Sequence, residues 1–223
     1  MSKNVFITAT GTDIGKTYVS ALIVKKMREV GLNCGYFKPV LSGVVAENGL
    51  LVESDCNYVV KTANIPAKAD DCVAYWWKEA VSPHLAAKRA GGEINISSIK
   101  EQFAEKQNQY DYLLVEGAGG ITCPLRLENG EKYLLKDLIK ELGLNIIIVA
   151  DGGLGTINST LLTVEYAKAN NIKIEGIILN NFNPDSFMHQ DNLKQTEYLT
   201  GVKVIAVVEK NQNDIKLLKD YFN

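Results

Sequence analysis

The chain has 223 residues and a formal net charge of −2, with acidic and basic residues spread along its length. This length is enough for one sizeable core, so we expect a single domain over residues 1–223. The balanced charge favours neither nucleic acid nor an anionic membrane surface as a partner. Four cysteines without a Cys-x-x-Cys spacing, and only two histidines, disfavour a zinc site or disulfide framework and favour a reducing cytoplasm. The N-terminus lacks a signal-peptide pattern, and no apolar run approaches membrane-spanning length.

The first motif is a small-residue loop between a short apolar run and an amphipathic pattern. Residues 5–7 are apolar and lead into Thr-Ala-Thr-Gly-Thr-Asp-Ile-Gly-Lys-Thr at 8–17, after which helical spacing continues until Gly31. Strand, loop, Gly-Lys-Thr and helix is the layout of a phosphate-binding P-loop. Backbone N–H groups and the helix N-terminus form the anion site of such a loop. We therefore expect Lys16 to reach the outer phosphates of a nucleotide and the Thr17 hydroxyl to ligate Mg²⁺.

The loop departs from the strict P-loop pattern, which places a glycine five residues before Gly15. That position is Thr10, and Gly11 follows it. The alternative interpretation is an ordinary glycine-containing turn with a helix-capping threonine. Because strand and helix patterns flank the loop on the correct sides, the sequence favours the P-loop.

The first half of the chain combines clear and weak structural signals. In chain order we predict a strand at 34–37 ending at Lys38-Pro39, a loop over 40–54, a helix opening at Ser54-Asp55 and running through 59–60, a loop over 66–77, a helix from 82–84 to about 91–92, and a helix capped at 97–98 and running to about 108.

The second half gives a cleaner pattern. Here we predict a strand at 112–115 ending at Glu116, a loop at 117–120, a helix over 133–142 stopped by Gly143, a strand at 145–150, a small-residue loop at 152–156, a helix through 161–166, a strand at 176–179 ending at Asn180, another helix, a strand over 202–208 and a last helix.

Apolar strands thus alternate with helices along the chain. This alternation predicts an α/β fold with a doubly wound, mostly parallel sheet and helices on both faces, a three-layer sandwich of the P-loop NTPase kind. Ligands of such sheets bind outside the carboxyl ends of the strands. The P-loop, Lys38, Glu116, the 152–156 loop and Asn180 should therefore share one edge of the sheet.

Three residues are candidates for holding a hard cation: Thr17, Asp55 and Glu116. Mg²⁺ prefers oxygen ligands, usually one or two carboxylates together with substrate phosphates. Glu116 follows an apolar strand, as a Walker-B-like acid does, and its alternative role is that of a surface acid. Asp55 follows a serine, so its alternative role is that of a helix cap.

Lys38, Asn180 and His84 each have a functional and a plain interpretation. Lys38 precedes a proline on the predicted edge, where a second cation beside Lys16 would stabilise charge on a transferring phosphoryl group, but a lysine at a strand end is usually solvated. The Asn180 amide could read a purine through paired donor and acceptor groups, or be a turn residue. His84 reads as a helix-start residue, and nothing near it indicates a nucleophile system.

Two classes of nucleotide-binding protein are disfavoured. The chain lacks an Asn-Lys-x-Asp guanine signature, which argues against a GTPase. It also lacks a second lysine at the start of the P-loop, which argues against the partitioning and nitrogenase-iron-protein types of ATPase.

Several segments together resemble the dethiobiotin synthetase family over nearly the whole chain. They are the loop 10–17, Tyr-Phe-Lys-Pro-Val-Leu-Ser-Gly at 36–43, Ser54-Asp55, Ser-Pro-His at 82–84, Val-Glu-Gly-Ala-Gly-Gly at 115–120, Leu-Gly-Thr-Ile-Asn at 154–158 and the strand ending at Asn180. Cobyrinic acid amidotransferases resemble the same fold but are usually longer, with a glutaminase domain for which this chain has no room. The chain departs from the family pattern at Ala9, where the loop usually has its first glycine, and at 202–209, which contain neither proline nor glycine.

The resemblance implies a role for each matching residue. Lys16, Lys38 and Thr12 would be catalytic, and Thr17, Asp55 and Glu116 would hold Mg²⁺. The nucleotide ATP would be bound by Gly11, Thr12, Asp13, Ile14, Gly15, Lys16, Thr17 and Tyr18, with Asn180 on the adenine. The substrate would be bound by Thr12, Lys38, Ser42, Gly119, Gly155, Thr156 and Asn158, the last three reaching across a homodimer interface.

The resemblance also implies a reaction: 7,8-diaminopelargonate, CO₂ and MgATP would give dethiobiotin, ADP and phosphate in biotin synthesis. The alternatives are a cobyrinic-acid-synthase-like ATPase that activates a carboxylate, and a P-loop protein that acts as a nucleotide switch.

Overall fold

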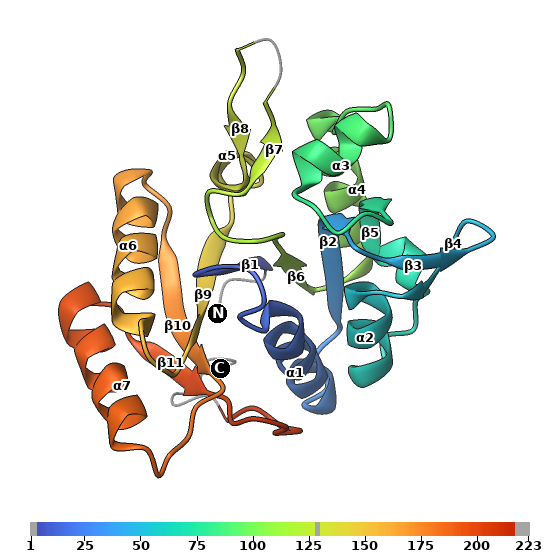
Figure 1. Ribbon diagram of the computed structural model, residues 1–223. Helices are drawn as coiled ribbons and strands as arrows, with labels where there is room; N and C mark the ends of the chain where they lie inside the picture. The colour runs from blue at the N-terminus through green and yellow to red at the C-terminus, as the bar shows by residue number, and fades with distance from the viewer. Residues whose placement is uncertain (1–3, 128–129, 217–223) are drawn as a thin grey trace.

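The computed structural model describes residues 4–127 and 130–216, which are organised around one seven-stranded sheet (Figure 1). Every pairing in the sheet is parallel. In sheet order the strands are β11 (Val204–Val207), β10 (Ile174–Asn180), β9 (Asn145–Asp151), β1 (Asn4–Ala9), β6 (Tyr112–Glu116), β2 (Cys34–Ser42) and β5 (Val73–Trp77). The predicted doubly wound parallel sheet is therefore confirmed.

Helices cover both faces of the sheet. One face carries α1 (Lys16–Glu29) and α2 (Asp55–Thr62), and the other carries α3 (Pro83–Arg89), α4 (Ile96–Gln109), α5 (Leu135–Glu141) and α6 (Thr156–Ala169), with α7 (Phe187–Thr200) beside α6. The smaller elements are the hairpin of β3 (Val45–Glu47) and β4 (Leu50–Glu53), the 3₁₀ turn η1 (Ala69–Cys72), and the pair β7 (Pro124–Arg126) and β8 (Tyr133–Leu134).

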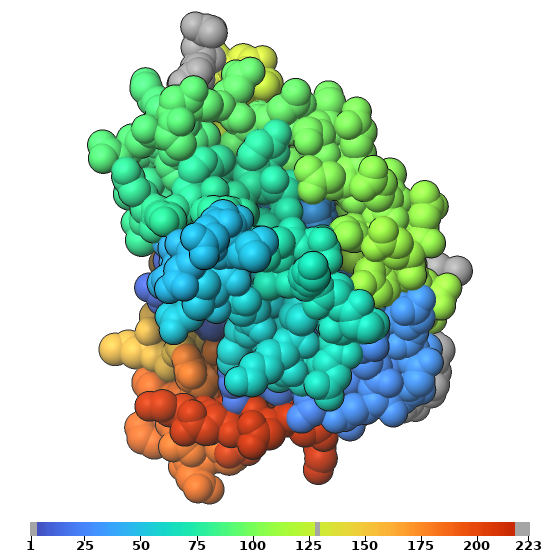
Figure 2. All heavy atoms as spheres, turned by 90° about the vertical axis from the view of Figure 1, so that its right-hand side faces the viewer, coloured from blue at the N-terminus to red at the C-terminus, as the bar shows by residue number. Residues whose placement is uncertain are grey.

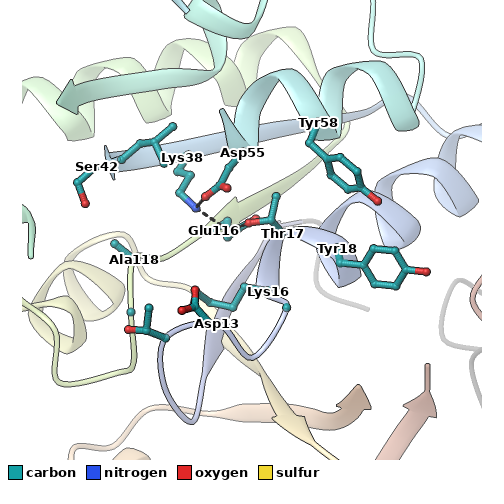
Figure 3. A pocket seen from close by; sticks show the side chains of 14 residues that line it. Asp13, Lys16, Thr17, Tyr18, Lys38, Ser42, Asp55, Tyr58, Glu116 and Ala118 are labelled. Carbon is teal, nitrogen blue, oxygen red and sulfur yellow. Dashed lines mark hydrogen bonds and ion pairs between the residues drawn. The ribbon is translucent and has the colours of Figure 1, made fainter. Parts of the chain in front are cut away.

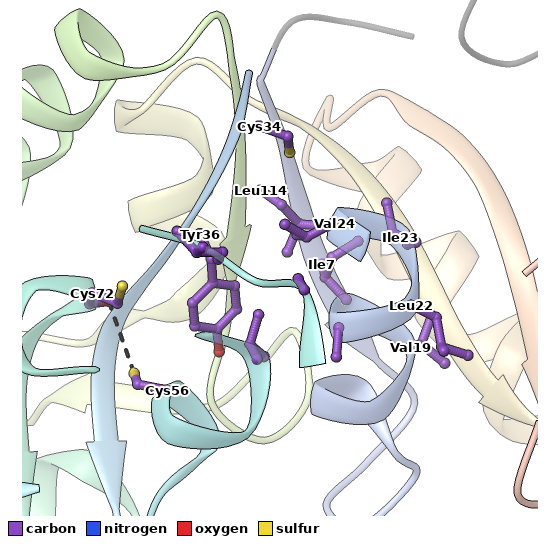
Figure 4. Close-up of a cluster of buried hydrophobic side chains, with 14 of the residues drawn as sticks. Ile7, Val19, Leu22, Ile23, Val24, Cys34, Tyr36, Cys56, Cys72 and Leu114 are labelled. Atoms are coloured by element: carbon purple, nitrogen blue, oxygen red, sulfur yellow. Dashed lines mark hydrogen bonds between the residues drawn. The ribbon is translucent and has the colours of Figure 1, made fainter. Parts of the chain in front are cut away.

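The core consists of two apolar layers, one on each side of the sheet. Successive side chains of a strand point to opposite faces, so Val5 and Ile7 of β1 join the layer under α1 while Phe6 joins the layer under α4 to α6. Figure 4 shows the first of these layers, where Ile7 of β1 and Leu114 of β6 lie beside Val24 of α1. Continuous burial on both faces explains why the central strands are apolar without alternation.

Two predicted loops are wrong. Strand β2 continues to Ser42, and the β3–β4 hairpin occupies most of the following segment, with its turn at Asn48-Gly49, where both residues have positive φ. Asn-Gly is the preferred two-residue hairpin turn, so this signal was present in the sequence. The stretch 66–77 holds η1 and the edge strand β5, which forms by pairing with β2. That partner is distant in sequence, which is why local signals did not reveal it.

Two further boundaries differ from the predictions. The helix predicted at 133–142 begins at Leu135, because the two preceding residues pair with β7. Helix α4 is capped by Asn95, whose side chain accepts a hydrogen bond from the Ser98 N–H at 3.2 Å, rather than by 97–98. A last helix was predicted after the strand at 202–208; residues 209–216 are not helical, and the remainder, 217–223, lies outside the described residues.

Figure 2 shows the side of the molecule that carries the β3–β4 hairpin and α2. The β3–β4 and α2 region lies between the α3 region above and the C-terminal segment below. Within the described residues, each helix is too short or too polar to cross a membrane.

We predict that Ile148→Ala lowers the free energy of unfolding by about 2–5 kcal/mol, because this fully buried side chain lies in the central strand β9 and truncation leaves a cavity. Urea unfolding followed by circular dichroism measures the change. Leu50→Ala, at a side chain that is 58% exposed, is the control and should change stability by less than about 0.5 kcal/mol. Equal losses for the two variants would contradict this account of the core.

Candidate active site

The loop between β1 and α1 has the backbone shape of an anion cradle. Asp13 and Gly15 adopt positive φ, 58° and 89°, and α1 begins at Lys16 with Gly15 as its N-cap. A Cβ on Gly15 would lie 2.2 Å from Nδ2 of Asn180, so only glycine fits there. The loop thus places a helix N-terminus and free amide donors at the carboxyl end of β1.

A pocket of about 650 Å³ opens at this edge of the sheet (Figure 3). Tyr18 and Tyr58 lie at one end of it, with ring centroids 6.4 Å apart, and Ser42 and Ala118 lie at the other end. The lining residues come from the P-loop, β2, α2, β6 and the loop after β6: Thr12, Asp13, Gly15, Lys16, Thr17, Tyr18, Lys38, Leu41, Ser42, Asp55, Tyr58, Glu116, Ala118 and Gly119.

Three charged side chains meet at the floor of the pocket. The Lys38 ammonium is 2.6 Å from Oε1 of Glu116 and forms a second ion pair with Asp55. Lys38 is 3% exposed and Glu116 is fully buried. The Thr17 hydroxyl donates to the same Oε1 of Glu116 at 2.8 Å, and the Tyr36 hydroxyl donates to Oε2 at 2.9 Å.

The pKa shifts in the cluster follow from burial and charge. Burial opposes the charge on Lys38, but Glu116 and Asp55 raise the pKa of its ammonium above the ordinary value. Burial also opposes ionisation of Asp55, yet Lys38 lowers its pKa below the ordinary value. Burial, followed by the neighbouring Lys38 charge, lowers the pKa of Lys16. Lys38 and Asp55 therefore each favour the charged form of the other.

The side chains of Lys16 and Asn180 each donate a hydrogen bond to a backbone carbonyl of the P-loop. The Lys16 ammonium donates to the carbonyl of Gly11 at 3.2 Å, so its side chain lies along the loop. Asn180, at the end of β10, donates from Nδ2 to the carbonyl of Ile14 at 2.9 Å. Its Oδ1 is buried and has no hydrogen-bond partner among the described residues. The Nδ2 group has a second N–H, so the amide keeps both a donor and an acceptor, and its contact with a purine stays a prediction.

The structure shows where each residue with two alternative interpretations lies. Ser54 caps α2 by accepting from the Asn57 N–H at 3.2 Å, so Asp55 is not the cap. Glu116 and Lys38 are buried rather than solvated. Asn180 is a strand residue, and the turn conformation belongs to Asn181 with φ 53°. His84 is the second residue of α3, as its plain interpretation predicted.

Most of the predicted site residues come together in the pocket. Those that line it are Thr12, Asp13, Gly15, Lys16, Thr17, Tyr18, Lys38, Ser42, Asp55, Glu116 and Gly119. Gly11 and Ile14 belong to the same loop, and Asn180 contacts it. Gly155 and Thr156 begin α6, where the Thr156 side chain is 3% exposed and its hydroxyl lies 3.3 Å from that of Thr160.

Asn158 lies in a second groove of about 400 Å³. Ala9, Thr10 and Gly120 form one side of this groove, and the exposed Leu162 of α6 forms part of the other. The described residues of one chain therefore do not bring Asn158 into the main pocket.

Four contributors to the site were not predicted: Tyr36, Leu41, Tyr58 and Ala118. Two of them carried a periodicity signal. Tyr36 is two residues before Lys38, so the two share a face of β2, and Tyr58 is three residues after Asp55 on α2. Leu41 and Ala118 are neighbours of predicted residues and carry no chemical signal of their own.

The donor set of the floor suits a hard divalent cation. Glu116 Oε1, the Asp55 carboxylate and the Thr17 hydroxyl supply only oxygen ligands, and a cationic group, the Lys38 ammonium, already lies among them. The described part of the chain contains no cluster of three or more His, Cys, Asp or Glu residues, so phosphate or water oxygens would have to complete the coordination.

We predict that Lys38→Met destabilises the protein by about 3–5 kcal/mol at neutral pH, because it leaves two carboxylates without their buried counter-ion. Adding millimolar MgCl₂ should recover part of the loss, since a ligand that binds only the folded state stabilises it by mass action. Urea unfolding with and without MgCl₂ measures both effects.

Lys100→Met is the matched control for this prediction. It removes an exposed lysine that pairs with Glu141 at 3.1 Å, and it should cost about 1 kcal/mol or less with no response to MgCl₂. A Lys38→Met protein as stable as this control would contradict the proposed role of the ion cluster.

Comparison with known proteins places the chain in a family. A family model described as an AAA domain matches residues 3–214. "ATP-dependent dethiobiotin synthetase BioD" of Brachyspira hyodysenteriae is 49% identical over 208 residues, which cover 93% of this chain and 92% of that protein. The protein of the same name from Clostridium botulinum strain Langeland is 49% identical over 217 residues, covering 97% and 94%.

Solved structures show the fold at much lower identity. The MinD cell division protein of Aquifex aeolicus is 14% identical and superposes with a TM-score of 0.53, covering 93% of this chain and 82% of that one. A ParA family ATPase from Chlorobium tepidum is 13% identical, with a TM-score of 0.54 and coverage of 95% and 87%. These likenesses concern the fold alone, whereas identity near one half over nearly the full length shows that the chain belongs to the ATP-dependent dethiobiotin synthetase family.

Proposed function

We propose that this chain catalyses the ATP- and Mg²⁺-dependent carboxylation and ring closure of 7,8-diaminopelargonate with CO₂, giving dethiobiotin, ADP and phosphate. The observation that carries the proposal is one pocket that joins the P-loop lysine to the buried cluster of Lys38, Asp55 and Glu116. A phosphate-binding loop beside a second, fixed lysine suits phosphoryl transfer to an anionic acceptor.

The chemistry requires placement and charge rather than a protein nucleophile. An amine of the substrate takes up CO₂ as a carbamate, whose oxygen attacks the γ-phosphorus as ADP leaves. The second amine then attacks the carbonyl carbon of the mixed anhydride, and phosphate departs as the ring closes. Lys16 and Lys38 approach the pocket from α1 and β2, on different sides, so they would flank the transferring phosphoryl group.

Thr17, Asp55 and Glu116 are the residues that would hold Mg²⁺. When bound, the ion would neutralise negative charge on the β- and γ-phosphates. The burial of Glu116 and its hydrogen bond from Thr17 keep the carboxylate in one place. These residues therefore orient the site before the nucleotide arrives.

The two ends of the pocket suggest how the substrates are distributed. The P-loop from Gly11 to Tyr18 would bind the phosphates, and the free Oδ1 of Asn180 would accept a hydrogen bond from the 6-amino group of adenine. Thr12, Ser42 and Gly119 line the region beyond Lys38, where the diamine and its carbamate would lie. The Ser42 hydroxyl donates to the Val81 carbonyl at 2.6 Å, so its orientation is fixed.

The proposal extends to assembly and location. Asn158 lies in a separate groove beside α6, which supports a homodimer in which Gly155, Thr156 and Asn158 serve the partner subunit's site. Strands β1 and β11, near opposite ends of the chain, belong to the same seven-stranded sheet, which supports a single domain over residues 1–223. Four free cysteines, three of them buried, support a reducing cytoplasm.

The decisive experiment is an assay with MgATP, bicarbonate and 7,8-diaminopelargonate, with mass detection of dethiobiotin. ATP binding without this product would contradict the proposal. A large nucleotide-linked conformational change without a small-molecule product would instead support a switch protein.

We predict that Lys16→Met and Lys38→Met each lower kcat by roughly 30- to 1,000-fold, equivalent to about 2–4 kcal/mol of lost transition-state stabilisation. Dethiobiotin formation at saturating substrates measures the effect. The exposed Lys100→Met variant should retain the parent rate. A folded Lys38→Met enzyme with the parent kcat would remove Lys38 from the mechanism.

Subunit mixing tests the proposed dimer. Lys16→Met and Asn158→Ala should each be nearly inactive alone, because each would damage both sites of its homodimer. In a mixed heterodimer one site would have both residues intact, so an equimolar mixture should recover about a quarter of the parent activity. Activity no higher than the mean of the two separate variants would show that Asn158 does not act across subunits.

A further inference from the structure

Tyr36 is a buried polar residue to which the reaction described above assigns no part. It lies in β2 two residues before Lys38 and is 1% exposed. Figure 4 shows its ring extending from β2 into the apolar layer, among residues such as Cys56 and Leu114. Its hydroxyl donates to Oε2 of Glu116 at 2.9 Å.

The two carboxylate oxygens of Glu116 therefore have different hydrogen-bond partners. Oε1 faces the pocket floor, where it accepts from the Thr17 hydroxyl at 2.8 Å and the Lys38 ammonium at 2.6 Å. Oε2 faces the core, where it accepts from Tyr36. One oxygen is therefore available to the pocket, and the other is held by a group that solvent does not reach.

We propose that Tyr36 is a positioning residue, whose hydroxyl fixes Oε2 of Glu116 so that the carboxylate presents Oε1 alone to a divalent cation. The inference rests on the proposed function, in which Glu116 is a ligand of that cation.

The physical basis is the soft terminal torsion of a glutamate. Rotation about the last side-chain bond has broad, roughly twofold minima, so a carboxylate without a partner on Oε2 samples several orientations. A hydrogen bond in a dry, apolar environment is strong and has no water to replace it. Partners of this kind orient metal ligands, and their loss typically weakens metal binding by about 10- to 100-fold.

The test measures cation binding directly. Mn²⁺ is titrated into protein held in excess over AMP-PNP, and the free ion is followed by its electron paramagnetic resonance signal. Tyr36→Phe removes only the hydroxyl oxygen, and we expect it to weaken Mn²⁺ binding by about 10-fold or more. Binding of AMP-PNP without metal should stay within twofold of the parent. Mn²⁺ affinity within twofold of the parent would overturn the inference.

A double-mutant cycle distinguishes positioning from a general loss of structure. If Tyr36 acts through Glu116, Tyr36→Phe should have no further effect on Mn²⁺ affinity in a Glu116→Gln background. An equal loss in both backgrounds would show a structural role and refute the inference. If Glu116→Gln alone leaves Mn²⁺ affinity unchanged, the proposed metal site itself is wrong.

Tyr112→Phe provides the matched control. Tyr112 begins β6, the strand that ends at Glu116, so this variant removes a phenol hydroxyl from the opposite end of the same strand. It should bind Mn²⁺ like the parent protein. Thermal melts of all variants establish that they are folded at the assay temperature.

Discussion

The interaction on which the site depends is the buried ammonium of Lys38 between the carboxylates of Glu116 and Asp55. The three side chains come from β2, β6 and α2, which are far apart in sequence. A charge buried without its partner would cost several kcal/mol, so the three elements are constrained to one relative arrangement. Thr17 joins the same cluster through Glu116, and this ties the first turn of the P-loop helix to the floor of the pocket. The phosphate-binding loop and the substrate side of the pocket are therefore positioned by one ionic contact.

The ion cluster also means that two positive groups would compete for the same carboxylate oxygens. On the proposed function, a divalent cation and the Lys38 ammonium require the same oxygens, Glu116 Oε1 and those of Asp55. When a cation binds these oxygens, their ion pairs with Lys38 would weaken. The Lys38 ammonium would then be free to interact with the phosphates. Before the cation binds, the ammonium pairs with the carboxylates and keeps the floor of the pocket from carrying two unpaired charges. The same lysine thus suits both the resting site and the reacting site.

Much of the architecture could be predicted because its signals are local. The P-loop layout, the apolar strands at 112–115 and 145–150 and the glycine stops each depend on adjacent residues, and the rule for parallel sheets then placed Lys38 and Glu116 on one edge. The elements missed were those that form by distant pairing, such as β5 against β2. Tyr36 shares a strand face with Lys38, but its role depends on a contact with Glu116, 80 positions away, which no local pattern indicates. Asn180 shows a further limit, since one of its amide N–H groups donates to the Ile14 carbonyl, a contact between residues 166 positions apart.

The irregular P-loop illustrates how backbone conformation, and not the motif, sets the requirement for glycine. Ala9 stands where the family usually has its first glycine, but it is the last residue of β1, 1% exposed and paired with Val149 of β9. A strand residue in that environment gains from a methyl group, which fills space in the core. The positive φ angles that the loop needs fall on Asp13 and Gly15, and aspartate tolerates this conformation better than most residues. The one strict steric demand is at Gly15, against Asn180, and the chain keeps its glycine there.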